Sequence, residues 1–353
     1  MSLVPGFIYF IRERDYLTNQ VGPYVKIGLT RYQRPVSARL SDHMTGNPRE
    51  EYSEWDIQVP MVDKLETYMH HYFAERRITG EWFEMDNAEV MALAVPLVQQ
   101  VLAEQVVTKP LLLNKDILKA TLSNGNIRVP TPAETVMHEA YIVADENLKI
   151  AKAHYEIKDK ELRTMIGTSD GIERIINLQQ KSQGATFDKN GFLAALTPAQ
   201  QALCNTSSQT SNGGPKIVGS RTLTHIDPAL HAAKGVATAA APNSIPVTNK
   251  SNPELPITQA LKDLHIEFLK TMRGVKVAEW QKEQYGAQLV NMLDVDEEIT
   301  GIISWVRAAS TTVSKFSATE AKNHFENIYN AHLTPRPDHI AVDIEKGHPY
   351  AYP

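Results

Sequence analysis

Short alternating or aromatic runs fill the first 86 residues and predict the strands of a small sheet. Residues 7–12 are an aromatic and β-branched run after Gly6, which is typical of a buried strand. Residues 24–29 alternate between apolar and polar positions, as a half-buried strand does, and residues 55–59 alternate again. The first two runs are separated by a polar stretch, so we predict that they form a hairpin with a long connection.

Helical patterns lie between and after these runs. Pro35 suits the first turn of a short helix that carries Arg39, because its fixed φ matches that position. Residues 61–77 carry an apolar stripe at helical spacing, and residues 87–105 are rich in Ala, Leu and Val. The segment Gly80-Glu81-Trp82-Phe83 begins the last predicted strand. The order β-β-α-β-α-β-α over about 100 residues predicts an α+β domain with a short mixed or antiparallel sheet flanked by helices.

The rest of the chain predicts mostly α-helical regions. Residues 133–166 are charged and strongly helix-forming, whereas residues 205–255 contain no aromatic residue and are rich in small and polar residues. Such a stretch buries too little apolar surface to offset its ordering entropy, so we predict a flexible linker there. Residues 256–333 return to helical periodicity before a proline-rich, irregular tail. The predicted divisions are residues 1–105, 106–204, 205–255 and 256–353.

Composition narrows the class of protein. Of 26 aromatic residues, 13 lie in residues 1–86 and only four in residues 87–255, which indicates at least two separately packed units. Cys204 is the only cysteine, so disulfides within the chain are excluded and a reducing, cytoplasmic location is expected. No window approaches 18 consecutive apolar residues, so we expect no membrane span. The net charge of −5 excludes a globally basic coat but not a local basic patch.

A local excess of positive charge distinguishes the region from Lys26 to Arg49. It contains five basic residues and only Asp42 as an acid, although residues 1–90 together hold 10 basic and 14 acidic residues. Local patches of this kind bind phosphodiester backbones, and a solvated charged loop is the alternative explanation. The basic residues are Lys26, Arg31, Arg34, Arg39 and Arg49.

Five short motifs occur in order along these predicted elements. They are Gly6-Phe7-Ile8-Tyr9, then Lys26-Ile27-Gly28-Leu29-Thr30, then Arg39, then Glu66 with His70 and Phe73, then Gly80-Glu81-Trp82-Phe83. This pattern over residues 5–86 resembles the phage and bacterial branch of the GIY-YIG nuclease superfamily, with KIG in place of YIG. The resemblance implies a metal-dependent DNA endonuclease.

The resemblance also implies roles for individual residues. Glu66 matches the carboxylate that holds one divalent cation, usually Mg²⁺, for which oxygen is the preferred ligand. Tyr9 is expected to help activate water, as general base or through hydrogen bonds, and Arg39 to offset charge on the phosphate. Lys26 stands at the second-motif tyrosine and is expected to bind phosphate. Further DNA contacts are expected from Arg31, Arg34, Arg49 and His70.

Each residue taken alone also has a purely structural explanation. A tyrosine in a buried strand is usually a core aromatic, a lone helical glutamate is usually solvated, and a lone histidine is usually a packing residue. The superfamily asparagine has no clear match, since Asn87 lies past the last motif. A DNA-binding or protein-interaction module with little catalysis is therefore the first alternative. A structural phage protein that self-associates, or binds a protein partner, through residues 256–353 is the second.

A second and weaker resemblance concerns residues 146–198. This segment is similar to one found late in YqaJ-type viral exonuclease and recombinase proteins, where it follows the catalytic core. The core itself is not evident in this sequence. The resemblance therefore implies only a small helical unit, and a charged helical spacer is the alternative.

Overall fold

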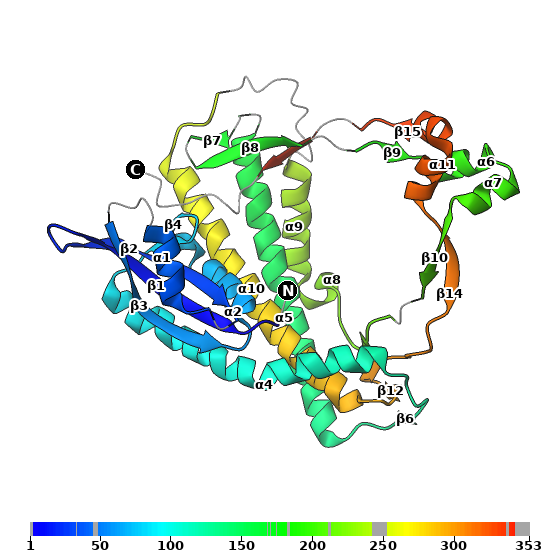
Figure 1. The fold of residues 1–353 in the computed structure, drawn as a ribbon, viewed down its shortest axis with the longest axis horizontal. Helices are drawn as coiled ribbons and strands as arrows, with labels where there is room; N and C mark the ends of the chain where they lie inside the picture. The colour runs from blue at the N-terminus through cyan, green and yellow to red at the C-terminus, as the bar shows by residue number, and fades with distance from the viewer. Residues whose placement is uncertain are drawn as a thin grey trace.

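The chain forms three bodies in the computed structural model (Figure 1). The described residues are 3–32, 34–44, 49–167, 169, 171–173, 175–181, 184–210, 213–241, 253–336 and 339–342. We call the bodies the head (residues 3–120), the helical body (α5, α9 and α10 with the small sheets at their ends) and the distal unit (residues 184–210 and 310–336). The α+β class expected from the sequence is confirmed.

The head is built on a five-stranded antiparallel sheet with the strand order β3-β1-β2-β5-β4. Its strands are β1 (Gly6–Asp15), β2 (Val21–Arg31), β3 (Arg49–Val59), β4 (Arg77–Thr79) and β5 (Trp82–Glu84). Its helices are α1 (Val36–Met44), α2 (Val62–Tyr72), the 3-10 turn Ala74–Arg76, α3 (Asn87–Glu89) and α4 (Val95–Ala120), the last two joined by the π-helical turn Val90–Ala94. The strands predicted at 7–12, 24–29 and 55–59 are therefore present and longer than expected, and β4 is an additional strand.

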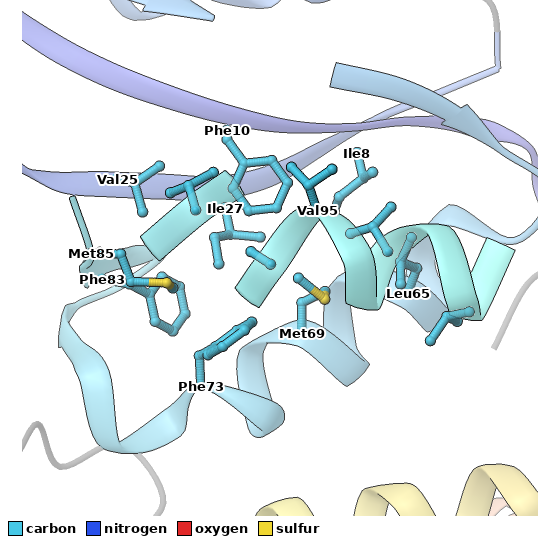
Figure 2. Packing of buried hydrophobic residues seen from close by; sticks show 14 of the residues in the cluster. Ile8, Phe10, Val25, Ile27, Leu65, Met69, Phe73, Phe83, Met85 and Val95 are labelled. Carbon is cyan, nitrogen blue, oxygen red and sulfur yellow. The ribbon is translucent and has the colours of Figure 1, made fainter. Parts of the chain in front are cut away.

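The two faces of this sheet differ. Alternate side chains of β1 and β2, such as Ile8 and Ile27, pack against α2 and α4 in a fully buried core (Figure 2). The intervening residues face the other way, where Tyr9 and Ile11 pack against Val36 of α1. Because side chains alternate along a strand, this arrangement puts every second residue of the first two motifs under α1.

The helical body consists mainly of two 35-residue helices that lie side by side, α5 (Pro132–Ile166) and α10 (Gln259–Leu293) (Figure 1). A capping box between Thr131 and Glu134 begins α5. At one end of these helices lies a sheet with the order β11-β13-β12-β6, and at the other a sheet with the order β16-β8-β7. The strands are β6 (Ile127–Arg128), β7 (Gly171–Ile172), β8 (Ile176–Lys181), β11 (Lys216–Ile217), β12 (Glu298–Ile299), β13 (Ile303–Ser304) and β16 (His339–Val342).

The distal unit is assembled from two segments that are more than 100 residues apart in the sequence. Two antiparallel strand pairs, β10 with β14 and β9 with β15, connect it to the rest of the molecule (Figure 1). Its small core includes Phe187, Phe192 and Phe316. The elements are β9 (Thr186–Phe187), α6 (Lys189–Ala194), α7 (Pro198–Leu203), β10 (Asn205–Gln209), β14 (Thr312–Phe316), α11 (Ala318–Ala331) and β15 (Leu333–Thr334).

The structure corrects the expected linker. Residues 213–241 are ordered and contain α8 (Leu223–Ile226) and α9 (Pro228–Ala240), which lie against α5. Lys234 pairs with Glu156 at 2.6 Å, and Arg221 pairs with Glu146 at the same distance. Helix α9 needs no aromatic residue because it lies on a surface that α5 already provides. Residues 242–252 of the predicted linker lie outside the described residues.

The other expected divisions also differ from the structure. The boundary at residue 105 falls inside α4, and residues 106–204 are divided among the head, the helical body and the distal unit. Residues 256–336 contain β12 to β15 besides α10 and α11. In the expected irregular tail, the described residues His339–Val342 form β16, and residues 343–353 lie outside the described residues.

One described helix has the length and composition to cross a membrane, the continuous run Asn87–Ala120. Its apolar residues are partly explained by the head core, because Val95, Val98 and Val101 are buried against the sheet. A core helix meets the same criterion of length and composition, so the run does not by itself indicate a membrane span.

Candidate functional site

Tyr9 and Gly28 lie opposite one another in the β1–β2 pair. A Cβ atom at Gly28 would stand 2.5 Å from the Tyr9 hydroxyl oxygen and 2.7 Å from two ring carbons, so only glycine leaves room for this ring. The close contact explains why the glycine of the second motif accompanies the tyrosine of the first. Tyr9 itself is only 1% exposed and belongs to the small core beneath α1.

Helix α1 brings Arg39 to the same place. Its guanidinium donates a hydrogen bond to the Tyr9 hydroxyl and also lies 3.8 Å from the Asp42 carboxylate. Burial raises the pKa of Tyr9, while the bond from Arg39 acts in the opposite direction. The net pKa remains above its ordinary value, so Tyr9 is a neutral hydroxyl near pH 7.

Glu66 reaches this site along an open edge of the sheet. Strand β5 pairs with only Tyr24 to Lys26 of β2, so the rest of that edge is left to α2. The ring of His70 holds α2 there, since its Nε2 lies 2.8 Å from the backbone oxygen of Ile27. At the other end, Arg31 of β2 pairs with Asp63 of α2 at 2.5 Å. Glu66 lies between these two contacts on the same side of the helix, which directs it to the edge beside Gly28.

The electrostatic surroundings of Glu66 disfavour its negative charge. Burial, followed by the nearby carboxylates of Glu81 and Asp63, raises its pKa to about 7. Arg31 and Arg39 lie near enough to lower the pKa but do not cancel these effects. Within the described part of the chain, Glu66 makes no hydrogen bond and no ion pair. The site thus contains a half-buried carboxylate without a bound positive partner.

Lys26 and Trp82 complete the same face of the sheet. They lie opposite one another in the β2–β5 pair, and Lys26 shares its face with Gly28 because the two are separated by one residue. The Lys26 ammonium is 3.7 Å from the Glu81 carboxylate. Phe83, the next residue of β5, points to the opposite face and is fully buried in the head core. Trp82 is half-buried, so part of its indole faces solvent.

The structure therefore brings four predicted residues together, namely Tyr9, Lys26, Arg39 and Glu66, with Arg31 beside them. Arg34 is exposed on the α1 side and pairs with Asp42 at 2.5 Å. Arg49 does not join them. It lies opposite Asp15 in the β1–β3 pair and forms an ion pair with Glu13 at 3.6 Å. Asp15 is six residues from Tyr9, which corresponds to about 20 Å along the strand.

His70 has a structural position. Besides its bond to Ile27, its ring packs against Phe83, with 5.4 Å between the ring centroids. Burial lowers its pKa to about 4, so the ring is neutral near pH 7 and brings no charge to a phosphate. The packing alternative considered for this histidine is therefore the one that the geometry supports.

Two carboxylates that lie close to Glu66 were not identified from the sequence. Glu81 stands in the fifth motif and was given no role, yet it contributes to the raised pKa of Glu66 and pairs with Lys26. Asp63 precedes Glu66 by three residues, a spacing that places both on one face of a helix. That spacing was a usable signal for Asp63, whereas the position of Glu81 depends on the β4–β5 turn.

The donor set fits a divalent cation bound at one protein carboxylate. Among the described residues, no three His, Cys, Asp or Glu side chains gather into a closed metal cage. Glu66 nevertheless offers hard oxygen atoms whose charge is not neutralised, with Glu81 and Asp63 close enough to add negative potential. A cation that keeps most of its water ligands, as Mg²⁺ does, suits such an open site.

Comparison with known families supports a nuclease-related head. Residues 6–95 match the T5orf172 domain. This domain is associated with phage nuclease families, so the head is a phage-type module related to nucleases or DNA binding. The matched residues are a quarter of the chain and contain every residue of the site. No curated protein and no solved structure matched the chain. No comparison supports the YqaJ resemblance, and the structure divides residues 146–198 among α5, the strands β7 and β8, and the distal unit.

Proposed function

We propose that the head is a metal-dependent DNA endonuclease of the GIY-YIG type, with Glu66 as the protein ligand of Mg²⁺ or another divalent cation. The observation that carries the proposal is the convergence of Tyr9, Arg39 and Glu66, which come from β1, α1 and α2. Packing alone gives no reason to place an arginine, a tyrosine hydroxyl and an unpaired carboxylate at one point. The ordered motifs and the T5orf172 match support the same conclusion.

Each residue has a definite task in this proposal. A divalent cation at Glu66 would supply Lewis-acid activation of water and of the phosphate. Arg39 and Lys26 face the non-bridging phosphate oxygens, where their charges stabilise the more negative transition state. The planar guanidinium of Arg39 is already oriented by the Tyr9 hydroxyl, so little ordering is needed when the phosphate binds.

Tyr9 acts through hydrogen bonds rather than as a phenolate base. Its pKa is raised by burial, so the ionised form is scarce near neutral pH. The hydroxyl accepts a hydrogen bond from Arg39 and keeps its own proton for donation. That proton can orient the attacking water or a phosphate oxygen. Of the two roles expected from the sequence, general base or hydrogen-bonding group, we therefore propose the second.

The test is cleavage of supercoiled and branched DNA by the full chain with Mg²⁺ and with EDTA. We expect Mg²⁺-dependent nicking that falls at least about 100-fold in Glu66→Gln and in Arg39→Ala. Glu139→Gln is the matched control, because Glu139 is an exposed residue of α5 outside the site. Cleavage that survives both site substitutions would reject the assignment.

A DNA-binding module with little catalysis is the second candidate. It is favoured by the position of Asn87, which is exposed at the first turn of α3 rather than inside the site. Salt-dependent DNA binding without cleavage under Mg²⁺, Mn²⁺ or Zn²⁺ would support this candidate over the nuclease.

A further inference from the structure

A cavity of about 500 Å³ lies where the head meets the helical body. Its volume is in the range of small-molecule sites, and its walls come from four helices and from Pro215 and Ile217 at β11. Helix α2 contributes Lys64 and Tyr68, α4 contributes Lys115, α5 contributes Tyr141, and α10 contributes Trp280 and Lys282. The cavity lies outside the site described above, since none of the converging residues lines it.

Rigid aromatic rings form part of the wall. Trp280 is only 9% exposed, and its Nε1 donates a hydrogen bond to Glu104 at 2.6 Å. Tyr141 packs against Gly286, where a Cβ atom would stand 3.3 Å from the ring. A glycine in the middle of a helix costs about 1 kcal/mol relative to alanine, and here it leaves room for the ring. Tyr68 and Tyr141 are half-buried and line the cavity, so their rings, rather than the buried indole of Trp280, suit the stacking of a planar ligand.

The charge of the wall is positive. Four lysines line the cavity against two glutamates, Glu279 and Glu283. Three of the lysines have carboxylate partners, such as Lys64 with Glu283 at 2.5 Å and Lys282 with Asp145 at 2.5 Å. Lys115 makes no ion pair with any described residue. Lys115 is half-buried and lines the same cavity as the aromatic residues, which favours an anion attached to a flat ring system.

We infer that this cavity binds a mononucleotide, with its base against the aromatic wall and its phosphate at Lys115. The ligand would contact both the head and the helical body, because α2 and α4 belong to one and α5 and α10 to the other. Lys64 and Tyr68 flank Glu66 in α2, so the cavity and the candidate active site use different sides of one helix. The inference does not depend on cleavage by the head.

Isothermal titration of the full chain with dAMP tests the inference. We expect saturable binding at one site, at least about tenfold weaker in Lys115→Ala and less than about twofold altered in Lys119→Ala. Lys119 is the matched control because it lies one turn further along α4, is exposed and does not line the cavity. Deoxyadenosine, which lacks the phosphate, is expected to bind at least about tenfold more weakly than dAMP.

The outcomes separate the two sites. Absence of saturable binding, or equal affinity of Lys115→Ala and the unaltered chain, would overturn the inference. Binding lost in Arg39→Ala but kept in Lys115→Ala would also overturn it, because dAMP would then occupy the sheet site. A short 5′-phosphorylated DNA strand that displaces dAMP would identify strand ends as the source of the nucleotide. A strand that fails to displace dAMP would identify the free mononucleotide.

Discussion

The half-buried carboxylate Glu66 of the head and the buried carboxylate Asp145 of the helical body have opposite surroundings. Asp145 is 3% exposed, and its oxygens accept bonds from Lys149 at 2.6 Å and from Lys282 at 2.5 Å. Ser220 adds a third bond at 2.6 Å. Although burial alone would raise its pKa, these partners lower the pKa to about 2. The pKa of Glu66 is instead raised to about 7 by burial and by the nearby carboxylates of Glu81 and Asp63, and no described cation forms an ion pair with it.

The difference separates a carboxylate that stabilises the fold from one that, under the proposed function, would bind a cation. Burial penalises both charges, and in the helical body two ammonium groups offset the penalty. In the head the nearby cations are engaged elsewhere, Arg31 with Asp63 and Arg39 with the Tyr9 hydroxyl. The unmet requirement for positive charge at Glu66 is what a bound cation would satisfy.

The largest effect is expected when Arg39 is replaced by lysine, and it is a loss of cleavage rate. The charge is kept, but the planar guanidinium that meets Tyr9 is lost. We expect the rate of Mg²⁺-dependent cleavage to fall at least about 100-fold, or about 3 kcal/mol in the barrier. Arg49→Lys is the control, because Arg49 lies about 20 Å away along the sheet, and its rate should change less than about twofold. An unchanged rate in Arg39→Lys would show that charge alone matters, and an equal loss in Arg49→Lys would show that the effect is not specific to the site.

The second prediction compares Asp145→Asn with Glu66→Gln in urea unfolding at pH 8. Asp145→Asn leaves Lys149 and Lys282 without their partner and should cost about 3 kcal/mol in the free energy of unfolding. Glu66→Gln removes a charge that the folded state disfavours, so the stability should stay equal or rise. A large loss in Glu66→Gln would show that Glu66 has a structural partner and would end the distinction.

The hydrophobic periodicity of the sequence predicted the strands and the helix that carry the site, but not the extent of the elements packed around them. The strands at 7–12 and 24–29 and the helix from 61 follow from periodicity, because each buries one face against the same core. The extent of α4 was underestimated, since Pro110 indicates a helix end in isolation whereas the packed helix continues through it. Periodicity describes one element, and tertiary contacts decide where it stops.

The features of the fold that could not be predicted from the sequence depend on contacts between segments far apart in the chain. The distal unit joins Phe187 and Phe192 to Phe316, and no local signal relates segments so far apart. Residues 213–241 look too polar to fold alone, yet they are ordered by ion pairs and packing on α5. In the site, the motifs located Tyr9, Lys26, Arg39 and Glu66, while the role of Glu81 required the β2–β5 register.

The third prediction concerns the loss of stability at acid pH that is due to protonation of Asp145. The folded pKa of Asp145 is about 2, below its ordinary value of 3.8, so its contribution is fully present above about pH 4 and is lost as pH falls towards 2. The shift corresponds to about 2 kcal/mol. Urea unfolding of the unaltered chain and of Asp145→Asn between pH 6 and pH 2 should give stabilities that converge by about this amount. Parallel curves would mean that Asp145 does not titrate with folding.

The smallest expected effect is a change in DNA affinity that distinguishes Trp82 from Trp305. Trp305 of the helical body is 3% exposed and donates a hydrogen bond to the Gly213 oxygen at 2.6 Å, whereas Trp82 is half-buried beside Lys26. We expect Trp82→Leu to weaken the binding of single-stranded DNA about fivefold, or about 1 kcal/mol, since an exposed indole on a cationic face can stack on a base. Fluorescence anisotropy in EDTA measures this without cleavage. Trp305→Leu should instead lower stability and leave the affinity of the folded chain unchanged, because a buried, hydrogen-bonded indole has no free face for a base.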